Sequence, residues 1–234
     1  MSWHRNLMVG FDLETTGTDP LTARIVTAAL VEVADGELVA RHNWLVDPGV
    51  PIPEEAVRIH GVTNERARSE GEPAAECAAR IARRLARYFA TGTPVVAFNA
   101  AFDFSVLSAE LVRHGLPSLE RLSGGVAAPI LDPLTIDRRV DRYRRGSRNL
   151  EAVCREYGVT LEGAHEAGAD ALAAVQVMAA IAGRYPEIRS TPPAELHRSQ
   201  IAWYAEWATG YQAYLRRTRD PLAVVDTLWP VRTA

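Results

Sequence analysis

The sequence contains no lysine, so all 26 of its basic residues are arginine, and they stand against 29 acidic residues. Because alanine is also abundant, a coding bias toward GC-rich codons explains this pattern more simply than a nucleic-acid-binding function does. An arginine cluster is therefore weaker evidence for a binding surface here than elsewhere. The net charge of −3 excludes a global positive field, so a nucleic-acid partner would have to meet local basic patches.

Cysteine and long apolar runs are scarce as well. The two cysteines, Cys77 and Cys154, lie far apart without a C-x-x-C motif or a histidine at metal-binding spacing, which argues against a zinc module and a disulfide framework. No apolar run approaches the roughly 20 residues of a membrane helix, and the first residues, MSWHRNL, do not resemble a signal peptide. We therefore expect a cytoplasmic protein.

What is present is an ordinary globular composition, with 47% hydrophobic and 24% charged residues. A chain of 234 residues fits one large domain with an extension. The pair Pro192-Pro193 marks a boundary. We expect a main domain over residues 1–190 and a helical extension over residues 191–234.

The first apolar run, LMVGFDLETTG over residues 7–17, alternates in a way that predicts a strand with two acids on one face. Asp12 and Glu14 then point the same way. Like charges side by side in a largely buried strand are costly unless a proton or a cation lies between them. A divalent metal ion meets this requirement, and the alternative is a strand whose end simply emerges into solvent.

The pattern of the remaining chain predicts an α/β fold. The dipeptide Asp35-Gly36, a strong hairpin signal, joins two β-rich runs over residues 24–34 and 37–47, so three antiparallel strands come first. Short buried strands are expected at residues 95–98 and 129–134. Apolar periodicity predicts a short helix that begins at Glu54 and longer helices over residues 73–89, 102–114, 148–157, 167–185 and 194–217.

Two of these helices carry further acids near their starts. Asp103 follows a short strand and shares a helix face with Asn99, at the place where open α/β sheets keep their ligands. Asp170 lies near the start of a later helix, five residues after His165. Because five helical residues turn through about 500°, we place His165 in the loop that enters the helix, free to aim at the same site. A lone loop histidine is otherwise simply exposed.

Four carboxylates from separate elements would make an oxygen-rich site that suits Mg²⁺ or Mn²⁺ better than zinc. Two such ions, about 3.5–4 Å apart, can clamp the attacking and leaving oxygens of an in-line phosphoryl displacement. A neutral histidine beside them can take a proton from the attacking water at physiological pH. The set therefore predicts metal-assisted cleavage of a phosphodiester.

The motifs FDLETTG, FNAAFDFSVL and HEAGADA, with VRIHGVT between the first two, occur in this order. Over about residues 7–181 the chain resembles the DEDDh branch of the DnaQ-like 3′-to-5′ exonucleases, the family of the proofreading epsilon subunit, oligoribonuclease and ribonuclease T. The resemblance implies a ribonuclease H-like fold with a five-strand mixed sheet flanked by helices, and an exonuclease domain over residues 1–190. It also implies that His165 is the general base and that two Mg²⁺ ions, replaceable by Mn²⁺, are bound by Asp12, Glu14, Asp103 and Asp170.

The resemblance further assigns the binding of the nucleic acid. Thr15, Thr16 and Gly17 would hold the 3′-terminal nucleotide, and its pocket would be lined by Asn99, Phe102 and His60. For Phe102 and His60, packing beneath the site is an equal alternative. The implied activity is release of nucleoside 5′-monophosphates from 3′ ends of single-stranded or frayed DNA. The alternatives are an RNA-directed 3′ exoribonuclease and a proofreading-type subunit that acts mainly through a polymerase or repair partner.

Two features lie outside the motifs. Residues 138–148, RRVDRYRRGSR, hold six arginines, which suits either a rim that contacts phosphate or a solvated face. The helix expected at residues 194–217 carries an apolar and aromatic stripe formed by Leu196, Trp203 or Tyr204, Trp207, Tyr211 and Tyr214. We favour docking of this stripe on the core, on a second copy in a homodimer, or on a polymerase or repair partner, over a stacking platform for single-stranded bases.

Overall fold

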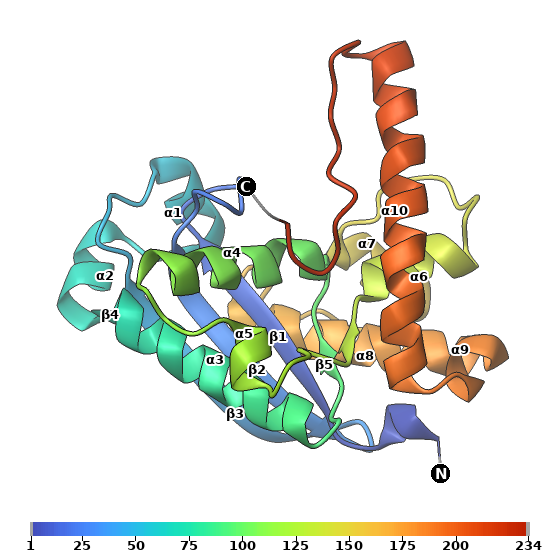
Figure 1. Cartoon of the computed structure of the whole chain (residues 1–234), viewed down its shortest axis with the longest axis horizontal. Coiled ribbons are helices and arrows are strands. Elements are labelled where there is room, and N and C mark those ends of the chain that lie inside the picture. The colour runs from blue at the N-terminus through green and yellow to red at the C-terminus, as the bar shows by residue number, and fades with distance from the viewer. Residues whose placement is uncertain (1, 233–234) are drawn as a thin grey trace.

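Three long antiparallel strands open one mixed sheet in the computed structural model, which describes residues 2–232 (Figure 1). They are β1 (Met8–Thr15), β2 (Ile25–Ala34) and β3 (Glu37–Asp47). Between β2 and β3, Asp35 and Gly36 adopt φ angles of 53° and 86°, the left-handed backbone that a two-residue hairpin turn requires. The predicted hairpin is confirmed.

Three short strands complete the sheet in the order β4-β3-β2-β1-β5-β6. Strand β5 (Val95–Val96) pairs in parallel with β1, and β6 (Ile130–Leu131) pairs in parallel with β5. A sixth strand, β4 (Glu72–Pro73), adds a two-residue edge beside β3 that the expected five-strand sheet did not include. The strand expected at residues 129–134 is shorter than predicted, because Pro133 already begins a helix.

The helices follow the predicted order closely. A 3₁₀ helix, η1 (Trp3–Arg5), precedes β1, and the α-helices are α1 (Glu54–His60), α2 (Asn64–Glu70), α3 (Ala74–Ala90), α4 (Ala100–Arg113), α5 (Leu119–Leu122), α6 (Pro133–Val140), α7 (Leu150–Tyr157), α8 (Ala167–Arg184), α9 (Pro186–Ser190) and α10 (Pro193–Thr218). The short helices α2, α5, α6 and α9 were not predicted. Within the described residues, none of the helices combines the length and apolarity needed to cross a membrane; the cytoplasmic location stays a prediction.

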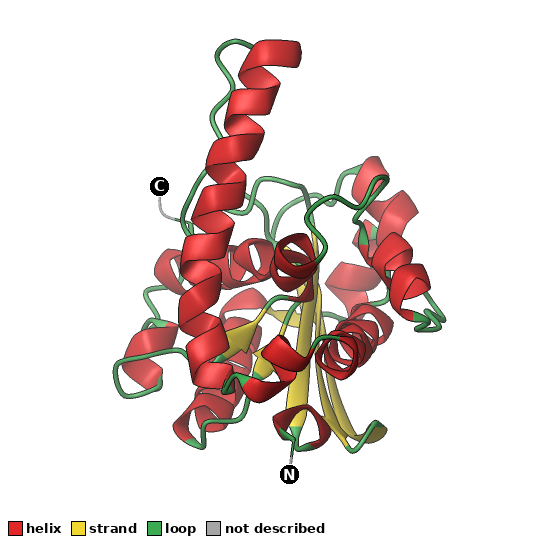
Figure 2. Ribbon diagram, turned by 90° about the vertical axis from the view of Figure 1, so that its right-hand side faces the viewer, coloured by secondary structure: helices red, strands yellow, loops and turns green. Residues whose placement is uncertain are grey.

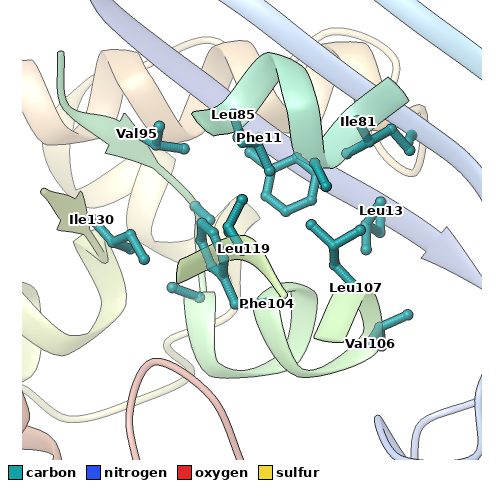
Figure 3. Packing of buried hydrophobic residues seen from close by; sticks show 14 of the residues in the cluster. Phe11, Leu13, Ile81, Leu85, Val95, Phe104, Val106, Leu107, Leu119 and Ile130 are labelled. Carbon is teal, nitrogen blue, oxygen red and sulfur yellow. The ribbon is translucent and has the colours of Figure 1, made fainter. Parts of the chain in front are cut away.

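Each face of the sheet buries its own apolar cluster. Helices α3 and α4 cover one face, where the rings of Phe11 and Phe104 meet edge to face with centroids 5.3 Å apart (Figure 3). Helix α8 covers the other face, where Met8 and Val31 pack against Met178. Because successive residues of a strand alternate between faces, β1 sends Phe11 and Leu13 toward α4 and sends Asp12 and Glu14 to the side of α8.

Gly10 allows α8 to approach β1 closely. A Cβ atom built on Gly10 would lie far inside contact distance of the Ala171 carbonyl oxygen and 2.7 Å from Cγ2 of Val31. No side chain fits at this position without moving the helix. Since Ala171 directly follows Asp170, the absence of a side chain at Gly10 determines how near Asp170 lies to β1.

The last helix begins on the body of the protein and ends beyond it (Figure 1). His197 and Gln200 hydrogen-bond the backbone of the edge strand β6, and Leu196, Tyr204 and Ala208 are buried. After Ala208 the helix projects into solvent, and the chain then returns alongside it (Figure 2). The division into residues 1–190 and 191–234 stays a prediction.

Replacing Gly10 with alanine is expected to destabilise the fold by at least about 1–3 kcal/mol, because α8 must move away from β1. The measurement is the urea unfolding midpoint at unchanged m-value. The matched control is Gly183→Ala in the same helix, where an added Cβ meets nothing within 4 Å, and which should be neutral or slightly stabilising. Equal midpoints for the two variants would contradict the close-approach explanation.

Candidate active site

Three of the predicted site residues meet at the end of β1. One ligand atom each from Glu14, His165 and Asp170 lies within 4.8 Å of the others. Asp170 accepts a hydrogen bond from the His165 backbone N–H through Oδ2, with a donor–acceptor distance of 3.3 Å. Its other oxygen, Oδ1, is buried and has no hydrogen-bond partner among the described residues. A buried carboxylate oxygen without a donor is what a hard cation would satisfy.

His165 lies in the loop before α8, as the helical-turn argument predicted, and not in the helix. Its backbone adopts a φ angle of 68°, in the left-handed region, where histidine is more common than most residues with a side chain. The side chain is exposed. The imidazole therefore has solvent on one side and two carboxylates on the other.

Asp12, on the same face of β1 as Glu14, and Asp103, at the start of α4, complete the acidic group. Asp103 is 3% exposed, and its Oδ1 accepts a hydrogen bond of 3.0 Å from the Leu13 backbone N–H, which ties the start of α4 to β1. Burial raises the pKa of Asp12 well above its usual value, and Asp103, Glu14 and Asp170 raise it further. All four predicted carboxyl groups therefore lie close enough to repel one another.

The pKa shifts of the remaining acids have the same main cause. Burial, followed by the charge of Asp170, raises the pKa of Glu14 to about 7. Burial also raises the pKa values of Asp103 and Asp170, and hydrogen bonds from the Leu13 and His165 backbone oppose these increases. Four acids that all resist ionisation need a compensating positive charge. The residues present therefore fit a bound divalent cation.

Hydrogen bonds of the Thr15 and Thr16 side chains stabilise the turn after β1. Thr15 Oγ1 donates to the Gly17 carbonyl at 2.8 Å, and Thr16 Oγ1 accepts from the Arg24 backbone N–H at 3.0 Å. A Cβ atom added to Gly17 would meet nothing within 4 Å. The turn thus leaves its outer side open beside the acids.

Phe102 and His60, each of which could line the nucleotide pocket or pack beneath the site, have different surroundings. Phe102 is half-buried and packs against the cluster under α4. His60 accepts a hydrogen bond from the Val62 N–H through Nδ1, while its buried Nε2 has no partner among the described residues. Burial lowers the pKa of His60, and the backbone of Thr15 opposes that shift, so this histidine lies against the turn.

Asp132, which the sequence analysis missed, supports the opposite wall of the site. It is 1% exposed and its Oδ1 accepts hydrogen bonds of 3.0 Å from the backbone N–H groups of Asn99 and Leu134. The first bond holds Asn99 in its left-handed conformation, with a φ angle of 65°. The Asp132-Pro133 pair is a helix-start signal that could have revealed this residue. The interior glycine of β1 could likewise have revealed Gly10.

A buried ion pair holds the turn after β1 from its far end. Glu110 of α4 is fully buried, and its Oε1 lies 2.6 Å from Nε of Arg24, the residue that also binds Thr16. Arg113 and His114 contact the same carboxylate. The turn is therefore anchored to the helix that carries Asp103.

Comparison with known proteins identifies the family of the chain. The chain matches the RNase_T family model, described as an exonuclease, over residues 9–178. The DNA polymerase III PolC-type of Lacticaseibacillus paracasei is 28% identical over 166 residues, which is 70% of this chain and 10% of that protein. The polymerase of the same name from Streptococcus agalactiae is 27% identical over 172 residues, which is 73% of this chain and 11% of that protein.

Solved structures show the same fold. E. coli Exonuclease I in complex with a dA16 oligonucleotide has a TM-score of 0.65 at 22% identity, and Exonuclease I from Methylocaldum szegediense has a TM-score of 0.63 at 25% identity. Each match covers 78% of this chain and 42% of the other. The chain thus spans about a tenth of the polymerases and less than half of Exonuclease I. Because the family model covers most of the chain and includes all three acidic motifs, the chain belongs to the DnaQ-like family of 3′-to-5′ exonucleases.

Proposed function

We propose that this chain uses two divalent metal ions to release nucleoside 5′-monophosphates from 3′ ends of single-stranded or frayed DNA. The observation that carries the proposal is the unpartnered Oδ1 of Asp170, buried beside Glu14 and His165 at the end of β1. The names of the similar proteins, a DNA polymerase and an exonuclease crystallised with a DNA oligonucleotide, favour DNA over RNA.

Asp12, Glu14, Asp103 and Asp170 would hold two Mg²⁺ ions, which Mn²⁺ could replace. When bound, such ions offset the charge of the phosphodiester and polarise its oxygens. The carboxylates orient the site, because Asp103 is fixed to the Leu13 backbone and Asp170 to the His165 backbone. We assign the proton of the attacking water to His165, because its exposed side chain lies beside Glu14 and Asp170 and an imidazole can act as a general base.

The turn formed by Thr15, Thr16 and Gly17 would receive the terminal nucleotide. Its open outer side faces solvent beside the acids, and the buried Nε2 of His60 offers a donor that no described residue uses. Asn99 and Phe102 would form the facing wall at the start of α4. A single strand fits this position because its terminal base can be held without a pairing partner.

The direct test uses the isosteric variants Asp12→Asn and Asp170→Asn with an end-labelled single-stranded oligonucleotide and Mg²⁺. Each variant should lose at least about 100-fold in kcat/KM, because metal-assisted stabilisation amounts to several kcal/mol. The matched control is Asp35→Asn in the exposed β2-β3 turn, which should retain wild-type activity. Full activity in both active-site variants would refute the assignment.

Substrate choice is tested by degrading single-stranded DNA, blunt duplex DNA and RNA that share one 3′ sequence. Single-stranded DNA should be degraded fastest and should yield mononucleotides, because the proposed pocket requires an unpaired 3′ end. Faster degradation of RNA would instead support the exoribonuclease alternative. Activity that appears only with an added polymerase or repair partner would support the proofreading-type subunit, which the polymerase relatives favour.

Metal binding also has a consequence for stability. The pKa of Glu14 is about 7 in the fold against an ordinary value of 4.5, so without metal the folded state keeps a proton that the unfolded state loses. The free energy of unfolding should then fall by about 3 kcal/mol as the pH rises through the range from 4.5 to 7, and this loss should be complete above pH 7. Saturating Mg²⁺ should restore stability more at pH 8 than at pH 5.

The measurement is Tm in EDTA and in Mg²⁺ at both pH values, for the wild type and for Glu14→Gln. Burial lowers the pKa values of His60 and His197, which destabilises the fold toward acid and acts in the opposite direction. The difference between wild type and variant therefore isolates Glu14. If Tm depended on pH equally in the two proteins, the raised pKa of Glu14 would not contribute to the pH dependence of stability.

A further inference from the structure

The arginine-rich segment and the aromatic helix α10 meet on one surface, which the proposed chemistry does not use. A cavity of about 300 Å³ lies between α6 and α10 and is lined by Arg138, Arg139, Arg142, Arg148, Trp203 and Trp207, among others. The aromatic residues Trp207, Tyr211 and Tyr214, here called the stacking ladder, continue from this cavity along the projecting part of α10.

The stacking ladder presents nearly parallel rings. The Trp207 and Tyr211 rings have centroids 5.4 Å apart and an interplanar angle of 13°, and the Tyr211 and Tyr214 rings are 6.2 Å apart at 15°. Tyr211 and Tyr214 are 39% and 42% exposed, while Tyr204, earlier in the helix, is 2% exposed. The expected docking on the core thus applies to the first half of the helix and leaves the second half open.

The guanidinium of Arg138 is positioned so that it could bind an anion. Its guanidinium carbon lies 3.5 Å from the centroid of the Trp207 ring, and a guanidinium stacked in this way keeps its N–H donors at its edge. Among residues 2–232, no hydrogen bond or ion pair engages these donors, because the nearby carboxylates of Asp137 and Glu206 bind other arginines. An arginine fixed on a ring with free donors suits a phosphate.

Four of the other five arginines of the segment have protein partners. Arg144 and Arg148 bind the fully buried Asp137 at 2.6 and 2.5 Å, so these two are structural, which neither reading of the segment anticipated. Arg139 and Arg142 face the carboxylate of Glu206, at 3.7 and 3.1 Å. The cavity lining nevertheless holds four arginines against one glutamate, and a phosphate would be attracted to it.

The surface is connected to the active site through Asp132. This residue binds the backbone of Asn99 and caps α6, and Arg138 follows six residues later, roughly 9 Å along the helix axis. In Figure 2 the N-terminus that leads into β1 lies at the lower end of the strands, and α10 extends past the upper end. The last turns of α10, to which Tyr211 and Tyr214 belong, therefore extend past the end of the sheet at which β1 ends.

We propose that Arg138 and the stacking ladder bind the part of a single strand that precedes the 3′-terminal nucleotide, with a phosphate on Arg138 and a base on the outer face of Tyr214, which ends the ladder and is supported by Tyr211. The identity of the polymer rests on the proposed function. Base–aromatic stacking does not depend on sequence and suits an exonuclease substrate. A second copy is a poorer occupant, because a twofold axis at this surface would bring the same arginines together.

The test compares long and short substrates. For Tyr211→Ala/Tyr214→Ala and for Arg138→Gln, the ratio of kcat/KM for a dT20 oligonucleotide to kcat/KM for a dinucleotide should fall about tenfold or more, because a dinucleotide ends before the ladder. The matched controls are Tyr143→Ala, an 88% exposed tyrosine outside the ladder, and Arg121→Gln on α5, which should keep the wild-type ratio.

Binding is measured separately, by fluorescence anisotropy of labelled dT20 in EDTA on an Asp12→Asn background. The ladder variant should weaken binding about tenfold or more, and Arg138→Gln should also reduce the slope of log K against log salt by about 0.7, the value for one phosphate contact. Sedimentation of the same proteins reports the oligomeric state, and thermal unfolding confirms that the exposed substitutions leave the fold intact.

Ratios and affinities that change equally in ladder and control variants would overturn the proposal. It would also be overturned if the ladder variant dissociated a dimer while its affinity for dT20 stayed at the wild-type value, since the surface would then join two copies. Weakened dT20 binding with no hydrolysis by the wild type would refute the proposed function and leave this surface standing. If the wild type hydrolyses DNA but the ladder and Arg138 variants keep the wild-type ratio of kcat/KM values, the proposed function would stand and the proposal for this surface would be refuted.

Discussion

The contact between α8 and β1 at Gly10 is the constraint on which the candidate site depends. A single absent side chain lets the Ala171 carbonyl lie against the strand, and the neighbouring Asp170 is thereby brought to Glu14 and His165. The approach is supported by a large buried surface, because α8 packs on the sheet through Ala171, Ala174, Val175 and Met178. Small residues on the helix and glycine on the strand therefore help to build the candidate metal site, although none of them is a candidate ligand.

The contact between α8 and β1 also brings the carboxyl groups of the site close enough to repel one another. Burial raises the pKa values of all four acids, and neighbouring carboxylates raise those of Asp12, Glu14 and Asp103 further. The fold thus holds a group of residues that would each be more stable ionised in water. Apolar clusters on both faces of the sheet offset this cost. Local conflict of this kind, stabilised by the surrounding fold, is typical of functional sites. Hydrogen bonds from backbone N–H groups to Asp103 and Asp170 aim these side chains but do not neutralise them.

Anchors outside the acidic group hold the loops that surround it. Buried Glu110 connects the turn after β1 to α4 through Arg24, and buried Asp132 connects Asn99 to the start of α6. Helix α10 in turn closes the sheet edge, because His197 and Gln200 satisfy backbone groups of β6 that would otherwise be exposed or unpaired. One helix thus protects the edge of the fold with its first half and offers aromatic rings to solvent with its second half.

The sequence by itself determined the long strands and the long helices and supplied the candidate acids. Alternation placed Asp12 and Glu14 on one face of a strand, Asp35-Gly36 defined the hairpin, and the helical repeat placed His165 outside α8, because each of these follows from the geometry of a few neighbouring residues. Only the tertiary structure decided the rest: that Arg144 and Arg148 bind Asp137, that Asp132 supports Asn99, and that Gly10 receives α8. These contacts join segments through packing, and no local period records which arginine finds a buried carboxylate or how closely a helix approaches a strand.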